Sequence, residues 1–158
     1  MARLQSIPRK VRTAILMGPR QQMLVVEASV SMLVARVSLA IFPFRRVAKG
    51  LGAFVPPSDP RVLRRGEGAS EHDAQMARLI GRAVRSSAPW MPFKSVCLQQ
   101  AMAAHAMLKR RGIPSVMHFG AGKSDEKPID AHAWLDAAGV KVTGYPVAST
   151  MAELGCFI

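Results

Sequence analysis

The sequence has few of the residues on which disulfide-rich and metal-binding modules depend. Its 158 residues include two cysteines, Cys97 and Cys156, and no Cys-x-x-Cys pair. Two cysteines are too few for a disulfide framework, and their spacing fits neither a zinc-binding motif nor thioredoxin-like chemistry. We therefore expect a protein of the reducing cytosol.

Long uncharged hydrophobic runs are also missing. The basic segment 1–20 is not a signal peptide, because its apolar run, residues 14–17, is too short. Residues 22–42 are the most apolar stretch, but Glu27 and Arg36 interrupt it, so we expect no membrane-spanning helix. A helix over 22–42 would have apolar flanks on two sides, which favours packing between other elements over a membrane interface.

Acidic residues are scarce in the first part of the chain. The sequence holds 22 Lys and Arg against 10 Asp and Glu, a net charge of +12, of which +10 falls in residues 1–66. This charge indicates a solvated helix face, an acidic partner protein, or contact with the anionic inner surface of the membrane. Nucleic acid is not expected as a partner, because no aromatic residues interleave with the basic clusters and no recognition motif is present.

The composition and the positions of glycine and proline predict an ordered α+β protein. Hydrophobic residues make up 49% of the chain, which argues against disorder. A segment rich in Gly and Pro over 50–60 predicts a linker, and it divides the chain into an N-terminal helical region, 1–55, and a catalytic-looking domain, 56–158. In the second part we expect helices over 70–87 and 96–111, an extended segment around Trp90, a strand over 115–120, a polar loop over 121–130, and a hairpin formed by 131–136 and 140–143.

Cys97 is the first candidate for chemistry. If Ser95 caps the helix that follows, Cys97 occupies the second helical position, where free backbone N–H groups and the helix dipole favour a thiolate. A lone cysteine on an amphipathic helix is, however, more often a buried structural residue.

His132 provides a partner for this thiol. It lies in a strand where period-two alternation places His132, Trp134 and Asp136 on one face. A strand histidine facing a cysteine at a helix start is the arrangement of papain-like and transglutaminase-like enzymes, in which the imidazole accepts the thiol proton and the thiolate attacks a carbonyl.

The flanking residues make the resemblance more specific. The segments APW at 88–90, CLQQA at 97–101, LKRRGIP at 108–114 and AHAWL at 131–135 closely resemble the leader peptidases of lasso-peptide biosynthesis, the B proteins, of the transglutaminase-like superfamily. The resemblance covers about residues 76–145, and the apolar helix followed by PFRR at 43–46 also looks like this family. It implies a transglutaminase-like, papain-like peptidase core with an antiparallel sheet.

The resemblance also implies a function and partners. Such proteins remove the leader from a ribosomally made precursor peptide, through a nucleophile here matched by Cys97 and a base matched by His132. A leader-recognition protein delivers the precursor, and an asparagine-synthetase-like cyclase closes the ring with ATP. The chain looks like the stand-alone peptidase and carries no cofactor motif of its own, so ATP dependence would belong to the complex.

The third catalytic residue is where the sequence departs from the family. If Asp136 pairs with Val140, His132 faces Gly144, at the position of the usual orienting aspartate. A turn one residue tighter would bring Tyr145 opposite His132 instead. Asp130 and Asp136 are candidate substitutes on the strand itself.

Other candidates have weaker support. Trp90, Gln100 and Trp134 are expected to bind substrate or wall the site, with core packing as the alternative. His105, His118 and Cys156 are expected to pack in the core, His72 to lie on the surface, and no metal site is expected.

Three alternative functions remain open. Gly144 favours a non-catalytic or partner-dependent binding module of the same fold. The fold also suits an acyltransferase acting on a small molecule, and the basic N-terminal part suits an adaptor for membrane or nucleic acid.

Overall fold

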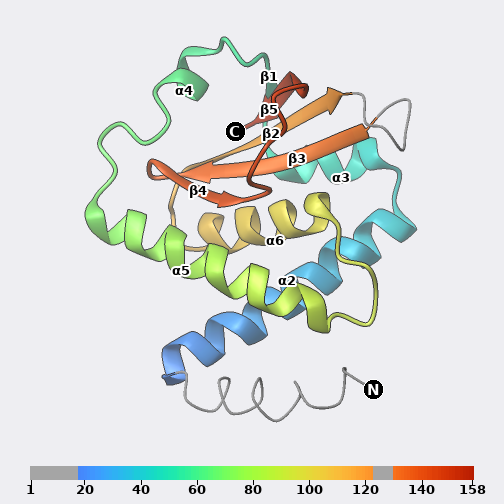
Figure 1. The fold of residues 1–158 in the computed structure, drawn as a ribbon, viewed down its shortest axis with the longest axis vertical. Coiled ribbons are helices and arrows are strands. Elements are labelled where there is room, and N and C mark those ends of the chain that lie inside the picture. The colour runs from blue at the N-terminus through green and yellow to red at the C-terminus, as the bar shows by residue number, and fades with distance from the viewer. Residues whose placement is uncertain (1–17, 123–129) are drawn as a thin grey trace.

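The protein is an antiparallel sheet with helices packed mainly on one face (Figure 1). The computed structural model describes residues 18–122 and 130–158, so the predicted loop over 121–130 lies almost entirely outside the described residues. The sheet order is β1-β5-β2-β3-β4, with every neighbouring pair antiparallel. The described elements are α2 (Pro19–Ile41), α3 (Phe44–Leu51), β1 (Phe54–Val55), α4 (Pro60–Leu63), α5 (Glu71–Ser87), a 3₁₀ turn (Ala88–Trp90), α6 (Cys97–Lys109), β2 (Ser115–Gly122), β3 (Asp130–Ala137), β4 (Val140–Thr143) and β5 (Ala152–Phe157).

The two long helices of the second half form for the local reasons that the sequence predicts. Ser70 caps α5 through a reciprocal pair of hydrogen bonds with Asp73, and one face of the helix, including Ala77, Ile80 and Val84, is buried. Helix α6 is followed by Gly112 at φ 67°, a left-handed conformation that favours glycine after a helix end. The α+β class is therefore confirmed.

The apolar helix α2 packs on α5 and α6 with one face only. Leu24, Ala28 and Met32 join the core formed by these helices and the sheet. Glu27 pairs with Arg110 and Arg111 at the end of α6, at 2.8 and 2.6 Å. The expected packing is thus confirmed for one apolar flank of α2 only, and the division at residue 55 stays a prediction.

The other face of α2 leaves large apolar side chains exposed. They include Met23, Val26, Val30, Val34 and Ile41. Although two charges interrupt it, α2 is long and apolar enough to cross a membrane by length and composition alone, a test that core helices of soluble proteins also pass. The charges of Glu27 and Arg36 therefore do not by themselves exclude a membrane-spanning helix.

Several elements were not predicted from the sequence. The segment read as a linker contains β1, and β5 had no predicted counterpart although it lies inside the sheet between β1 and β2. Alternation in β5 is weakened by Glu153 and Gly155, so its strand conformation comes from two-sided pairing. Around Trp90 the chain forms a 3₁₀ turn, and the expected extended segment is wrong there.

The two faces of the sheet have different characters. Ala133, Leu135 and Met117 face the helices and belong to the main core. The alternate positions of β2 and β3 carry His118, Trp134 and Asp136, on the side that α4 covers (Figure 1). Polar side chains thus gather on the face opposite α6.

Candidate functional site

Cys97 is the first residue of α6. Its N-cap is Val96, so the expected Ser95 cap is wrong and Cys97 lies one position earlier in the helix than expected. The Ser95 hydroxyl instead contacts the Met32 sulfur at 3.2 Å. Because valine has no side-chain acceptor, the first backbone N–H groups of α6 have no cap from residue 96. The half-buried Cys97 thiol thus lies beside uncapped N–H donors at the positive end of a helix.

The two glutamines that follow shape this helix start. The Gln99 side chain is buried, and its Oε1 accepts the Val96 N–H at 2.8 Å. The Gln100 Nε2 donates to the Ser95 carbonyl at 3.0 Å. Gln100, a predicted substrate-binding residue, therefore already supports the loop that leads into Cys97.

His132 is held by a backbone carbonyl. Its Nε2 lies 2.6 Å from the Gly144 oxygen. A carbonyl only accepts, so Nε2 carries a ring proton. This bond fixes the ring and turns Nδ1 away from the Gly144 carbonyl.

The structure does not show Cys97 and His132 as a hydrogen-bonded pair. Within residues 18–122 and 130–158, the hydrogen bond of His132 is to Gly144 and no hydrogen bond joins it to Cys97. Cys97 packs against the core between the helices and the sheet. His132 lies beside Trp134, on the opposite face of the sheet. Since His132 and α6 lie on opposite faces of the sheet, His132 Nδ1 and the Cys97 thiol can meet only if the end of β3 rearranges, and the pairing stays a prediction.

The hairpin register differs from the predicted one. Ala137 pairs with Val140 across a two-residue turn of Ala138 and Gly139, both at positive φ, and a bulge then shifts Leu135 to Thr143. The predicted pairing of Asp136 with Val140 is therefore wrong, and the alternative turn, one residue tighter, is the one that forms. The described pairing ends at Thr143 and does not place Tyr145 opposite His132. Gly144 nevertheless reaches His132, through its backbone and not its side chain.

Neither aspartate considered as a substitute bonds to His132. The Asp136 carboxylate binds Arg65 at 2.9 Å and the Tyr145 hydroxyl at 2.5 Å, and it faces His118 Nε2 at 3.4 Å. Burial raises the pKa of Asp136, but hydrogen bonds from His118 and Tyr145 and the charge of Arg65 outweigh it, so the pKa is lowered overall. The prediction that Asp136 orients His132 is therefore wrong. Asp136 lies next to His118 instead. Asp130 lies two residues before His132 on the same strand, with no described hydrogen bond between them.

The two tryptophans have different environments. Trp134 is buried, and its ring stacks on His118 at 5.4 Å and near His132 at 6.0 Å between centroids. Trp90 is 59% exposed in the turn that follows α5. Trp134 therefore walls His132, as expected of a site residue, whereas a role of Trp90 stays a prediction.

A buried polar cluster is the feature that sequence reasoning missed. His118 Nδ1 lies 2.5 Å from Glu153 Oε1, and the Cys156 thiol lies 3.0 Å from the same oxygen and 3.4 Å from His118 Nδ1. Burial, then the neighbouring Glu153, raises the pKa of Cys156 to about 12. The expectation that Cys156 and His118 are simple core residues is correct for their burial and wrong for their partners. No spacing motif could reveal the cluster, because β5 was not predicted.

The remaining histidines lie where they were expected. His105 is buried on α6 and its Nδ1 is 2.9 Å from the Ser115 hydroxyl. Burial is the main cause that lowers the pKa of His105. His72 is exposed at the start of α5.

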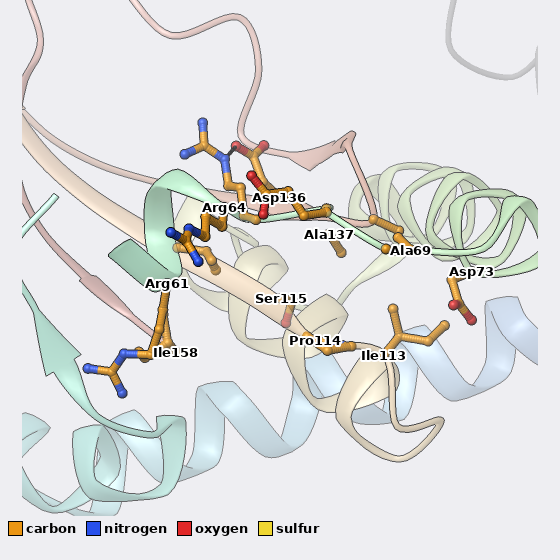
Figure 2. Close-up of a pocket in the computed structure, with 16 residues that line it drawn as sticks. Arg61, Arg64, Ala69, Asp73, Ile113, Pro114, Ser115, Asp136, Ala137 and Ile158 are labelled. Carbon is orange, nitrogen blue, oxygen red and sulfur yellow. Dashed lines mark ion pairs between the residues drawn. The ribbon is translucent and has the colours of Figure 1, made fainter. Parts of the chain in front are cut away.

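A pocket of about 520 Å³ opens on the face of the sheet that α4 covers. Figure 2 shows Arg61 and Arg64 toward one end and Asp73 toward the other, with Asp136 beside the arginines. Neither Cys97 nor His132 lines this pocket, so it is separate from the predicted catalytic pair.

Comparison with known proteins identifies the family. The family model described as transglutaminase-like superfamily matches residues 38–153. The match begins in α2, ends in β5 and includes both Cys97 and His132. The chain therefore belongs to the transglutaminase-like superfamily. No curated protein and no solved structure matches it significantly.

Proposed function

We propose that this protein is a cysteine peptidase that removes the leader from a lasso-peptide precursor, with Cys97 as nucleophile and His132 as base. The observation that carries the proposal is the hydrogen bond from His132 Nε2 to the Gly144 carbonyl at 2.6 Å. A base that acts through Nδ1 needs its ring proton on Nε2, and this hydrogen bond holds a proton there. Membership of the transglutaminase-like superfamily supports the same pair of residues.

The chemistry follows from these two side chains. His132 Nδ1 accepts the Cys97 thiol proton, and the thiolate attacks the carbonyl carbon of the last leader residue. The uncapped N–H groups at the start of α6 stabilise the resulting oxyanion. The proton then moves from the imidazolium to the departing amine of the core peptide, and water hydrolyses the thioester to release the leader.

The substrate and partners of this proposal come from the resemblance of the sequence. The substrate is a ribosomally made precursor peptide, presented by a leader-recognition protein. The product, a core peptide with a free amine, passes to an asparagine-synthetase-like cyclase. We propose no cofactor for the peptidase step, because the thiol and the imidazole supply the nucleophile and the proton transfer.

A specific observation favours a second candidate, a non-catalytic binding module. Cys97 and His132 form no hydrogen bond in the described part of the chain, and a main-chain carbonyl, not a carboxylate, contacts His132 Nε2. This candidate retains the fold and binds the precursor without cutting it. It differs from the first in the reactivity of the Cys97 thiol.

The decisive experiment incubates the protein with precursor and leader-recognition protein and follows cleavage by mass spectrometry. We expect Cys97→Ala and His132→Ala to abolish cleavage, whereas His72→Ala, a change at an exposed histidine, leaves it intact. Unchanged cleavage by Cys97→Ala would disprove the peptidase assignment.

Thiol labelling distinguishes the two candidates when no cleavage is seen. A slow electrophile should modify Cys97 faster than Cys156 if His132 activates the former, and His132→Ala should remove this advantage. Equal labelling rates in the wild type and in His132→Ala would favour the binding module.

We also propose that the protein works in the cytoplasm and contacts the anionic inner membrane surface. The exposed apolar face of α2 and the basic residues Arg45, Arg46 and Lys49 of α3 support this contact, since both kinds of side chain favour such a surface. Flotation with anionic and neutral vesicles tests it. Binding only to anionic vesicles is expected, and binding to neither vesicle would exclude it.

A further inference from the structure

Three side chains able to ligate metal converge on the sheet face opposite α6. His118 comes from β2, and Glu153 and Cys156 come from the neighbouring strand β5. Their ligand atoms lie within 4.8 Å of one another. His118 is 1% exposed and Cys156 is fully buried, whereas the Glu153 side chain is 32% exposed. The cluster thus has a rigid buried side and one ligand at the surface.

His118 lies between two carboxylates. One ring nitrogen faces the Glu153 carboxylate at 2.5 Å and the other faces the Asp136 carboxylate at 3.4 Å. A neutral imidazole has a single N–H, so one nitrogen would turn a lone pair toward an anion. Asp136 also has Arg65 as a cation, but Glu153 has no described ion pair other than the one with His118. A positive charge on the Nδ1 side, from a ring proton or from a bound cation, would therefore match the Glu153 carboxylate.

We propose that His118 Nδ1, Glu153 and the Cys156 thiolate bind a zinc ion, with Asp136 as the carboxylate that orients His118. A bound zinc ion supplies a positive charge beside Glu153 and leaves the ring proton of His118 on Nε2, facing Asp136. A carboxylate behind a ligating histidine is the usual support of zinc sites. The mixture of sulfur, nitrogen and oxygen ligands favours zinc over magnesium or calcium, which prefer oxygen alone.

The distances allow the ion with a small movement. In tetrahedral zinc sites the ligand atoms lie about 3.3–3.6 Å apart. Here sulfur and nitrogen are already 3.4 Å apart, while the Glu153 oxygen is 3.0 Å from sulfur and 2.5 Å from nitrogen. Only the partly exposed carboxylate has to withdraw, by less than about 1 Å. The two buried ligands keep their positions.

The proton balance is specific. Binding takes the thiol proton from Cys156 and any proton from His118 Nδ1, both of which go to solvent, while Glu153 enters as a carboxylate. Zinc binding is therefore accompanied by proton release and weakens as the pH falls. The ion would connect β2 to β5 and so fasten the C-terminal strand. The site is independent of the proposed peptidase pair, because it includes neither Cys97 nor His132.

Cobalt absorption provides the test, on untagged full-length protein freed of metal by a chelator. A cobalt ion bound to thiolate gives a charge-transfer band in the near ultraviolet, and zinc should displace it. We expect the band to saturate at one cobalt per chain. Cys156→Ser should remove it, whereas the matched control Cys97→Ser should keep it.

A second variant covers the case in which Cys156→Ser fails to fold. Glu153→Gln keeps the size of a partly exposed side chain. We expect it to lower the zinc affinity at least tenfold, measured by competition with a chelator of known affinity. Circular dichroism confirms the fold of each variant. No band at stoichiometric cobalt, a band that survives Cys156→Ser, a band lost in Cys97→Ser, or unchanged affinity in Glu153→Gln would each overturn the proposal.

Discussion

His132 donates its Nε2–H to the Gly144 carbonyl oxygen at 2.6 Å, so a main-chain atom occupies the place of the usual orienting side chain. A carbonyl fixes the ring and its tautomer, but it carries no negative charge to stabilise an imidazolium. We expect such a base to be well oriented and less strongly assisted than one backed by aspartate.

Gly144 itself cannot be replaced without cost. It adopts φ 81°, and a Cβ there would lie 2.4 Å from the Ala133 oxygen and 2.7 Å from Trp134 Cα. We therefore expect Gly144→Asp to disturb the hairpin and to lower activity, because the backbone has no room for the family's aspartate at this position.

A matched pair of substitutions separates strain from crowding. Gly112 has a similar φ of 67°, but a Cβ there meets nothing within 4 Å. Gly112→Ala should cost about 1–2 kcal/mol from the left-handed backbone alone. Gly144→Ala should cost a further 1–3 kcal/mol or so from the contacts. Urea unfolding of both variants measures the difference, and equal costs would contradict the close approach at Gly144.

A substitution at Val96, the N-cap of α6, tests whether the uncapped N–H groups serve the reaction at a cost in stability. Val96→Thr changes the shape of the side chain little and adds an oxygen that can accept an N–H of the first turn. We expect the free energy of unfolding to rise by about 0.5–1 kcal/mol. Precursor cleavage should fall, because the hydroxyl competes with the oxyanion for the same donors. A more stable variant with undiminished cleavage would show that these N–H groups do not serve the reaction.

Glu27 should contribute measurably to the packing of α2. Its side chain is 27% exposed and accepts hydrogen bonds from both Arg110 and Arg111. Glu27→Gln should lower the free energy of unfolding by about 1 kcal/mol. The control Glu71→Gln removes an ion pair whose carboxylate is 83% exposed, and we expect a change close to zero. Similar effects in the two variants would contradict a structural role for the Glu27 pairs.

The same glutamate should affect stability in acid. Hydrogen bonding to Arg111 is the largest cause that lowers the pKa of Glu27. A carboxyl whose pKa is lowered on folding stabilises the protein above its unfolded pKa, about 4.3, and loses this contribution as the pH falls further. Below that pH, wild-type stability should therefore decline more steeply than that of Glu27→Gln, as thermal unfolding at several pH values would show.

Cys156 should govern stability in mild alkali when no metal is bound. Its pKa is raised to about 12, so the folded state retains a proton that the unfolded chain loses from about pH 8.5. Stability is therefore complete below this pH and declines as the pH rises toward 12. Chelator-treated Cys156→Ser should show a weaker decline between pH 8.5 and 10, before the single tyrosine, Tyr145, titrates in the unfolded chain. Parallel curves for the two proteins would contradict the buried, protonated thiol.

Much of the fold could be predicted because its signals are local. The capping box at Ser70, the Gly112 helix end and the alternation of β3 each depend on residues a few positions apart. The strand β5 could not be predicted, since its conformation depends on pairing with β1 and β2, which are far away in the sequence. The cluster of His118, Glu153 and Cys156 depends on that pairing and was missed with it.

The sequence by itself determined the α+β class, the main helices and the place of Cys97 at a helix start, because side-chain periodicity and capping act over a few residues. Only the tertiary structure decided what surrounds His132. The bulge after Leu135 shifts the hairpin register and presents the Gly144 carbonyl, a backbone atom that no residue type could indicate. Backbone geometry and strand pairing thus set the chemistry of the site, because both depend on contacts between segments that the sequence alone does not bring together.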